Sequence, residues 1–277
     1  MSDSSSGDTD GATRITRDPE LLRRARPLLE RYASYFRPEV RGFDRLPETG
    51  PMLVVGNHSG GQLPPDIPIL VTAWWRERGT DEPLHFLIHS LVLNLPGIGA
   101  ILGRGGAVEA NPKRAEEVLD EGGVLIDYPG GDHEVFRPWK DRNRIDFGGR
   151  TGFVRLALRA GVPVVPAVSV GAHETVVVLN RGEGIARRLG LDKRFRVSVM
   201  PLVFGPPFGI VPGGIPTWPL PAKVTVELLE PIDWSERFGP EAAQDREVVQ
   251  ACYDEVTGKM QDALDRLAAE RQFPVVG

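Results

Sequence analysis

A histidine and an aspartate lie close together in a glycine-rich segment that follows an apolar run. The segment reads MLVVGNHSGGQLPPDIPIL, with seven residues between His58 and Asp66. A histidine can take a proton from a hydroxyl group near neutral pH, and a carboxylate on its other ring nitrogen fixes the tautomer and stabilises the imidazolium. Because the sequence has no G-x-S-x-G motif, the pair would activate a bound alcohol rather than a protein nucleophile. The alternative is a histidine held only by its loop, with Asp66 capping a helix.

A second candidate segment, VLIDYPGGDHEVF, covers residues 124–136. An apolar strand followed by Gly130 and Gly131 allows backbone N–H groups to approach an anion or an oxyanion. Glu134 follows within reach of the same position. A plain tight turn explains the two glycines equally well.

Basic residues are concentrated just after this segment. Residues 137–155 contain two acids and six basic residues: Arg137, Lys140, Arg142, Arg144, Arg150 and Arg155. This local surplus suits the phosphates of a lipid head group or of coenzyme A, and Arg150 and Arg155 are candidate substrate ligands. Arg104, in the expected glycine-rich loop GIGAILGRGGAV, is a separate candidate for binding an anion. A solvated loop of mixed charge is the alternative for any single arginine.

A metal site is not expected from this sequence. His85 and His89 are four residues apart, but His85 alternates with apolar neighbours in an expected strand, so the helical H-E-x-x-H geometry is absent. The acidic and histidine side chains of residues 132–134 are consecutive and point in different directions. The single cysteine, Cys252, lies in a helical pattern and is interpreted as a packing residue.

These candidate residues need a scaffold, and the hydrophobic pattern indicates one. Strands are expected over residues 39–46, 51–57, 84–89, 124–129, 162–171 and 222–234, and helices over 18–36, 66–79, 111–123, 151–161 and 248–271. Alternating strands and helices predict an α/β fold with a mostly parallel twisted sheet and helices on both faces. Ligands bind outside the carboxyl ends of such strands, and both His58 and the Pro-Gly-Gly turn are expected there.

The ends of the chain and one internal segment have distinct compositions. Residues 1–17 are polar and predict a disordered tail, and residues 18–277 predict a single domain. Within it, 18–37 form an amphipathic helical arm that Pro27 interrupts or restarts; it docks on the body or lies on a membrane surface. Residues 201–222 are rich in Pro and Gly yet apolar, which predicts an ordered, irregular loop that could face lipid.

Composition excludes several classes of protein. The chain has 277 residues and a formal net charge of −5, so it is not built to coat nucleic acid. One cysteine excludes an intramolecular disulfide framework, which fits a reducing cytoplasm. No apolar run is long enough for a transmembrane helix. High Arg, Ala and Gly usage is typical of a GC-rich bacterium.

Four segments, in this order, resemble the lysophospholipid acyltransferase superfamily. VVGNHSGGQLPPD is similar to its His/Asp block, GIGAILGRGGAV to its second block, and GVPVVPAVSVG to its Val-Pro-rich fourth block. VLIDYPGGDHEVF stands in the place of the Phe-Pro-Glu-Gly block. The Pro-Gly-Gly-x-x-Glu form resembles the branch that holds monoacyl- and diacylglycerol acyltransferases and phytyl ester synthases. The resemblance extends from about residue 38 to the C-terminus and implies a glycerol-3-phosphate acyltransferase-like fold.

The resemblance also implies a reaction. A fatty acyl chain would pass from acyl-CoA, or from an acyl carrier protein, to the hydroxyl of a lysophospholipid or glycerolipid, without a cofactor or an acyl-enzyme. His58 would be the general base and Asp66 its orienting partner. Gly130, Gly131 and Glu134 would place the acceptor, and the arginines would hold phosphate. The family block has four residues between His and Asp, so here the loop must bulge for the pair to meet.

Such an enzyme would work on the cytoplasmic side of a membrane as a peripheral protein in phospholipid synthesis. Two alternatives use the same residues. A hydrolase would use His58 to activate water on an ester or thioester, and would favour an open, wet pocket. A non-catalytic lipid-binding protein would have an ordered groove, with His58 turned into the core.

Overall fold

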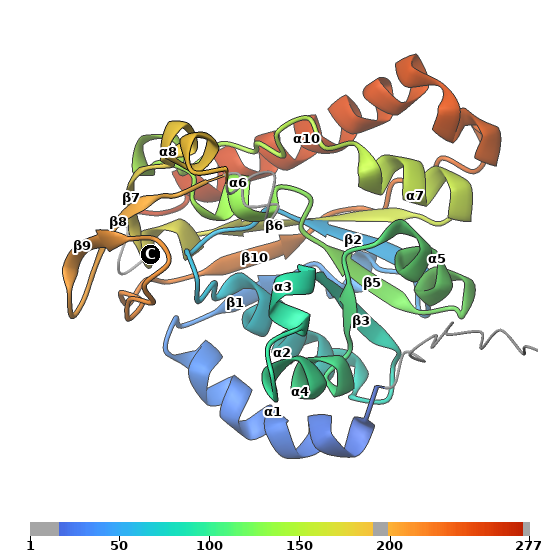
Figure 1. The fold of residues 1–277 in the computed structure, drawn as a ribbon. Helices are drawn as coiled ribbons and strands as arrows, with labels where there is room; N and C mark the ends of the chain where they lie inside the picture. Colours follow the sequence, from blue (N-terminus) through green and yellow to red (C-terminus); the bar gives the residue numbers. More distant parts are fainter. Residues whose placement is uncertain (1–16, 191–198, 274–277) are drawn as a thin grey trace, which may run out of the picture.

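A seven-stranded mixed sheet forms the centre of the molecule (Figure 1). The computed structural model describes residues 17–190 and 199–273. The strand order is β1-β10-β6-β2-β5-β3-β4, and every neighbouring pair is parallel except β10 with β6. The strands are β1 (Glu39–Arg41), β2 (Met52–Gly56), β3 (Leu84–Ile88), β4 (Ala107–Glu109), β5 (Val124–Asp127), β6 (Val164–Val170) and β10 (Thr225–Leu228). The predicted mostly parallel sheet is confirmed.

The central strands are apolar on both sides because helices cover both faces of the sheet. Alternate residues of β2 point into two separate cores: Leu53 and Val55 into one, Met52 and Val54 into the other. The first core is covered by α5 (Pro112–Asp120), α7 (Gly152–Ala160) and α10 (Arg246–Ala269). The second is covered by α1 (Pro19–Ser34) and α2 (Asp66–Arg78). Cys252 is buried in the first core, as a packing residue would be.

Helix α1 packs on the body of the protein rather than standing away from it. Its Leu22 and Ala33 are buried in the core that α2 also lines, and the Tyr32 hydroxyl donates to the Leu63 carbonyl (3.1 Å). The helix runs through Pro27 without a break, so the expected interruption is wrong. Packing of the buried face outweighs the one backbone hydrogen bond that proline removes.

The segment expected to be an irregular loop contains a β-hairpin. Strands β8 (Leu202–Gly205) and β9 (Gly209–Pro212) pair antiparallel, and β7 (Val177–Asn180) pairs with β8 to form a separate three-stranded sheet. Alternating burial along β8 and β9 accounts for the pairing, because Val203 and Val211 point into a small core of their own. With α8 (Glu183–Arg188), these strands lie together at one end of the molecule (Figure 1).

The remaining elements are short, and two of them differ from the sequence prediction. The stretch expected to be a strand over 39–46 ends at Arg41 and continues as a 3₁₀ turn, because Gly42 takes a φ of +89°. The glycine-rich stretch around Arg104 is a helix rather than a loop. These elements are η1 (Phe43–Arg45), α3 (Ser90–Leu93), α4 (Ile98–Arg104), α6 (Gly131–Val135), η2 (Trp139–Asp141), η3 (Ala172–Glu174) and η4 (Pro240–Gln244).

Two expectations concern the ends of the chain and the membrane. Residues 1–16, most of the predicted tail, lie outside the described residues. Within residues 17–190 and 199–273, no helix combines the length and the apolar character needed to cross a bilayer.

Candidate active site

The structure brings His58 and Asp66 together at the carboxyl end of β2. His58 stands two residues beyond the strand, and Asp66 is the first residue of α2. The Nδ1 atom of His58 lies 3.0 Å from Oδ2 of Asp66. The His58 side chain is 14% exposed and the Asp66 side chain 1%, so the imidazole is reachable and its partner is buried. His58 is therefore not turned into the core, as a purely lipid-binding protein would have it.

Glycines close the seven-residue gap between the two side chains. Gly60 and Gly61 have φ values of +105° and +69°, which only glycine adopts without strain. A side chain on Gly60 would also collide with Pro65, since an added Cβ would lie 2.5 Å from its Cδ. The loop thus folds back on itself, and the bulge that the sequence requires is formed.

The hydrogen bonds around Asp66 decide which nitrogen of His58 carries the proton. Asp66 Oδ2 also accepts from the Ser59 N–H (2.8 Å), and Oδ1 accepts from the Ile67 N–H (2.9 Å) at the start of α2. A carboxylate can only accept hydrogen bonds, so its bond to the imidazole uses a proton on Nδ1. Nδ1 therefore carries the proton, and Nε2 presents a lone pair. No described residue forms a hydrogen bond with Nε2.

Tyr128 supports the imidazole from one side. Its ring lies 4.6 Å from that of His58, centroid to centroid, with the planes tilted by 32°. The ring occupies the space that a side chain at Gly56 would need. Burial, with the nearby charges of Asp66 and Glu134, raises the pKa of the Tyr128 phenol well above its ordinary value, so it stays protonated. Tyr128 was not predicted from the sequence; its place between strand β5 and Pro-Gly-Gly was the available signal.

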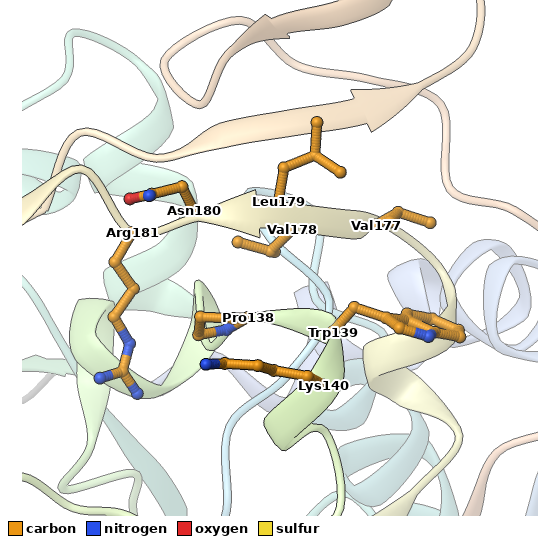
Figure 2. A pocket seen from close by; sticks show the side chains of 8 residues that line it. All are labelled: Pro138, Trp139, Lys140, Val177, Val178, Leu179, Asn180 and Arg181. Carbon is orange, nitrogen blue, oxygen red and sulfur yellow. The ribbon is translucent and has the colours of Figure 1, made fainter.

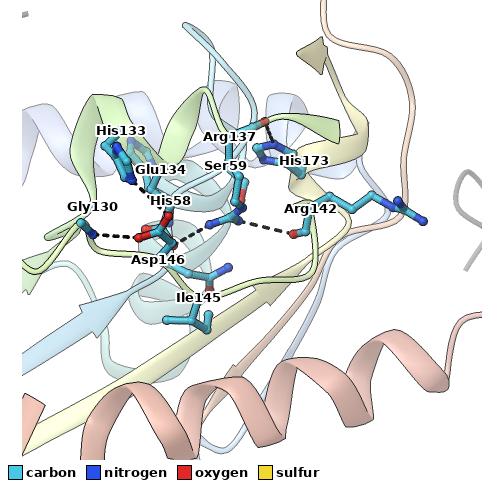
Figure 3. A network of polar contacts seen from close by, with 12 residues as sticks. His58, Ser59, Gly130, His133, Glu134, Arg137, Arg142, Ile145, Asp146 and His173 are labelled. Carbon is cyan, nitrogen blue, oxygen red and sulfur yellow. Dashed lines mark hydrogen bonds and ion pairs between the residues drawn. The ribbon is translucent and has the colours of Figure 1, made fainter. Parts of the chain in front are cut away.

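Glu134 holds the backbone of His58 instead of facing a ligand (Figure 3). Its Oε2 accepts from the His58 N–H (2.9 Å), and its Oε1 accepts from Arg137 Nη1 (2.9 Å). Both side chains are fully buried. Burial raises the pKa of Glu134 above its ordinary value, against the opposing pull of Arg137. The expectation that Glu134 contacts the acceptor is corrected, because both of its oxygens are occupied and neither is accessible.

The Pro-Gly-Gly turn lies beside this pair and is held by Arg150. Arg150 Nη1 donates to the carbonyl of Gly130 (2.7 Å), and Nη2 pairs with Asp132 (2.9 Å). Gly131, at φ +47°, gives its own N–H to the Tyr128 carbonyl (3.0 Å). The N–H of Gly131 therefore shapes the turn and is not free to bind an anion. Gly130 and Arg150 are at the site, and Arg150 remains partly exposed.

Two arginines that were predicted to bind the substrate lie away from the His58 pair. Arg104 precedes β4, the edge strand that lies three places from β2 in the sheet, and pairs with Asp18 at the start of α1 (2.5 Å). Arg155, on α7, donates to the Ala243 carbonyl. Neither side chain is brought to the His58 pair. The sequence pattern around each arginine showed its charge but not its tertiary partner.

The rest of the basic stretch is divided among different tasks. Arg137 is buried against Glu134, and Arg142 stacks on Trp139, its guanidinium 4.9 Å from the ring centroid. The backbone from Pro138 onward, with β7, lines a groove of about 480 Å³ (Figure 2). Its walls are largely apolar, and two of the lining side chains, Lys140 and Arg181, are cationic.

A second histidine–aspartate pair lies close to the first (Figure 3). His133 Nε2 lies 3.1 Å from Asp146 Oδ2, and its Nδ1 lies 3.9 Å from Glu183. Asp146 also pairs with Arg181 (3.3 Å). Burial opposes ionisation of Asp146, but the Gly148 N–H, His133 and Arg181 together hold its pKa below the ordinary value. Spacing along the chain did not reveal this pair.

The histidines considered for a metal serve the fold. His85 is buried in β3, and burial, reinforced by the charge of Arg17, lowers its pKa to about 4. His89 Nδ1 accepts from the Leu91 N–H (3.1 Å) and caps α3. In the part of the chain that the structure describes, no cluster of three or more His, Cys, Asp or Glu side chains could hold a metal ion.

Comparison with known sequences finds a match to one family of proteins. A sequence model described as Acyltransferase matches residues 37–170, which include the His58 pair and the Glu134 turn. The matched residues make up just under half of the chain.

Among relatives, an uncharacterized protein of Mycobacterium tuberculosis is 33% identical over 248 residues, covering 89% of this chain and 66% of that protein. The chain thus spans just under two-thirds of the length of these mycobacterial relatives. A bovine protein named as a DGAT1/2-independent enzyme synthesizing storage lipids is 28% identical over 231 residues, covering 82% of this chain and 63% of that protein.

A solved structure shares the fold. The 1-acyl-sn-glycerophosphate acyltransferase PlsC from Thermotoga maritima superimposes with a TM-score of 0.57 and 18% sequence identity. The match covers 91% of this chain and 81% of that one. The expected acyltransferase-like fold is therefore confirmed.

Proposed function

We propose that the protein is an O-acyltransferase that moves a fatty acyl chain from a thioester to the hydroxyl group of a glycerolipid or lysophospholipid. The observation that carries this is the reachable imidazole of His58, whose Nδ1 is fixed by buried Asp66 at 3.0 Å. The match of residues 37–170 to the acyltransferase family model, and the names of the lipid-synthesising proteins that this chain resembles, support it. The donor is acyl-CoA or an acylated carrier protein, and the reaction uses no cofactor.

The proposed reaction is a direct transfer. His58 Nε2 removes the proton of the acceptor hydroxyl while its oxygen attacks the thioester carbonyl carbon. The imidazolium so formed is stabilised by Asp66 through Nδ1–H. The tetrahedral intermediate then collapses, the carbon–sulfur bond breaks, and the proton on Nε2 passes to the leaving thiolate. The products are the ester and the free thiol, and no acyl-enzyme forms.

Rigid positioning is the main contribution of the protein in this scheme. His58 is fixed through its ring by Asp66 and Tyr128, and through its backbone by Glu134. A base held in one orientation needs no reorganisation when the acceptor arrives. Arg150, partly exposed beside the turn, is the charged side chain of the site best placed to meet a phosphate. Because the acceptor is a lipid, we place the reaction at the cytoplasmic surface of a membrane.

The test is a thiol-release assay with palmitoyl-CoA, run with a panel of lipid alcohols and with product analysis by mass spectrometry. We expect release to depend on one class of acceptor and an esterified lipid to appear. His58→Ala should lose about two or more orders of magnitude in kcat, as removal of a general base does. Thiol release at the same rate without acceptor would identify a thioesterase instead. Absence of turnover with every acceptor, despite lipid binding, would identify a lipid-binding protein.

A further inference from the structure

The outer face of the three-stranded sheet is apolar and uncovered. Phe204 and Ile210 are paired across β8 and β9, and both are exposed together with Leu202 and with Phe208 at the turn. Trp218 is exposed on the segment that follows, and exposures within this group run from 41% to 64%. We call these five residues the hairpin face. The opposite side of the same strands is buried, so the face is a single-sided apolar surface.

The composition around this face suits hydrocarbon better than a protein partner. Residues 199–222 contain no Asp, Glu, Lys, Arg or His, and their one hydroxyl side chain, Thr217, is buried. Protein interfaces carry about one hydrogen bond per 100–200 Å². The side chains of the hairpin face offer almost no groups to form them. Trp218 is the exception, and an indole is favoured where hydrocarbon meets water.

Positive charge lies at the same end of the molecule as the hairpin face. Helix α8 continues from β7 and exposes Arg187 and Arg188 beside the apolar Ile185 and Leu189. Apolar side chains mixed with arginines are typical of elements that bind the surface of a bilayer containing anionic lipids. Figure 1 shows α8 at the same end of the molecule as β7, β8 and β9. The positive charge complements an anionic surface. It therefore favours a bilayer with anionic lipids over other apolar partners of the hairpin face.

The face is also continuous with the groove. Leu179 lines the groove and is exposed on β7, the strand paired with β8 (Figure 2). At its other wall, the groove reaches Pro138, next in sequence to Arg137, which pairs with Glu134. Leu179 thus borders the groove on the side of the apolar face, and the opposite wall begins one residue along the chain from Arg137.

We propose that the hairpin face, with Arg187 and Arg188, docks the protein on a membrane surface that contains anionic lipids, so that a lipid acceptor enters from the bilayer. This inference rests on the proposed function only for the acceptor; the docking itself is independent of chemistry. The occupant of the face is the bilayer, with apolar side chains in the acyl–headgroup boundary and arginines among the lipid phosphates.

The test is co-sedimentation of the full chain with vesicles of phosphatidylcholine, with and without phosphatidylglycerol. Ile210→Glu and Phe208→Glu should weaken binding by about tenfold or more, because each places a charge in the apolar layer. Arg187→Glu with Arg188→Glu should remove the preference for phosphatidylglycerol. Ile101→Glu, on α4, is the matched control: Ile101 is 61% exposed and Ile210 60%. Binding of that variant should equal the wild type.

A second measurement separates docking from chemistry. With a short-chain, detergent-dispersed acceptor, the hairpin variants should turn over at the wild-type rate; on vesicles they should be slower. Equal vesicle binding by wild type and Ile210→Glu would overturn the docking surface, whether or not the protein proves to be an acyltransferase. A shift of Ile210→Glu from dimer to monomer in size-exclusion chromatography would also overturn it, since a second copy would then be the occupant. Absence of acyl transfer by the wild-type protein, with intact vesicle binding, would count against the proposed function alone.

Discussion

Two histidine–aspartate pairs lie within one network, and only one of them has the form of a base. His58 meets Asp66 through Nδ1 at 3.0 Å, and His133 meets Asp146 through Nε2 at 3.1 Å. The distances are nearly equal. What differs is the remainder of each ring and each carboxylate.

The second nitrogen and the burial of the acid distinguish the pairs. Asp66 is almost completely buried and serves one histidine, whereas Asp146 is 29% exposed and is shared with Arg181. The Nδ1 atom of His133 faces the Glu183 carboxylate at 3.9 Å. His133 therefore cross-links two acids, while His58 keeps one nitrogen for a ligand. The histidine of a His–Asp pair can act as a base only when its other ring nitrogen is open to a ligand.

The largest expected effect is on turnover. His58→Gln should lower kcat by about 10²–10⁴-fold, since no other described side chain can take the proton at that position. His133→Gln should change kcat by less than about threefold, because it removes a cross-link and no base. Both variants are compared in the acyl-transfer assay. Equal losses in the two variants, with both folded by circular dichroism, would end the distinction between the pairs.

Substitutions of Asp66 and Asp146 should also differ in their effect on kcat, by a smaller factor than substitutions of the two histidines. Asp66→Asn keeps the shape but replaces the acceptor that sets the tautomer of His58, so kcat should fall about 10–10³-fold with little change in KM. The pH profile should also change, because the imidazolium loses its stabilising charge. Asp146→Asn is the control, and wild-type kcat is expected. A higher KM with unchanged kcat for Asp66→Asn would contradict the orienting role.

Arg137 and Arg181, each next to one of the two pairs, should contribute differently to the free energy of unfolding. Arg137→Met leaves the buried carboxylate of Glu134 without its ion pair and should cost about 3–5 kcal/mol of unfolding free energy. Arg181→Met removes an ion pair nearer the surface and should cost about 1 kcal/mol. Urea denaturation measures both. Adding Glu134→Gln to Arg137→Met should recover part of the loss; no recovery would mean that the arginine acts through packing.

The smallest effect is on the pH dependence of stability. Burial raises the pKa of Asp127, at the end of β5, to about 7, whereas the pKa of Asp146 is lowered. The folded protein therefore binds more protons at Asp127 than the unfolded chain between about pH 4 and 7, so this contribution to stability falls as pH rises. Asp146 contributes in the opposite direction, and its contribution is lost in acid.

Thermal unfolding from pH 5 to 8 tests this difference. Asp127→Asn should raise the Tm at pH 8 relative to wild type by about 2–5 °C and leave the Tm at pH 5 nearly unchanged. Asp146→Asn should show no gain at pH 8. A parallel shift of Tm at all pH values would mean that titration of Asp127 is not involved.

The fold was accessible from the sequence because its strands are short apolar runs bounded by glycines and prolines. The runs at β2, β5 and β6 could be placed in a parallel sheet, and that placement put His58 at a carboxyl end. The hairpin at β8–β9 was missed because prolines and glycines outweighed the alternation in Leu-Val-Phe and Ile-Val-Pro.

The candidate site was only partly accessible, for a physical reason. A sequence shows the type and spacing of residues but not which way they turn once packed. The glycines between His58 and Asp66 showed that a bulge could form, and the structure has one. Nothing local distinguishes Arg137, fully buried, from Arg104 on the surface. For the same reason Glu134 was assigned to the ligand, although it faces inward.

The contact between Gly56 and Tyr128 has a consequence for how this site could change over generations. The phenol ring fills the volume of a Cβ at position 56, so any larger residue there displaces the ring that lies against His58. Position 56 is open to mutation only after position 128 has become smaller, and shrinking 128 first removes the support of the imidazole. The two positions are locked in an epistatic pair, and a lineage leaving this arrangement must cross a less fit intermediate.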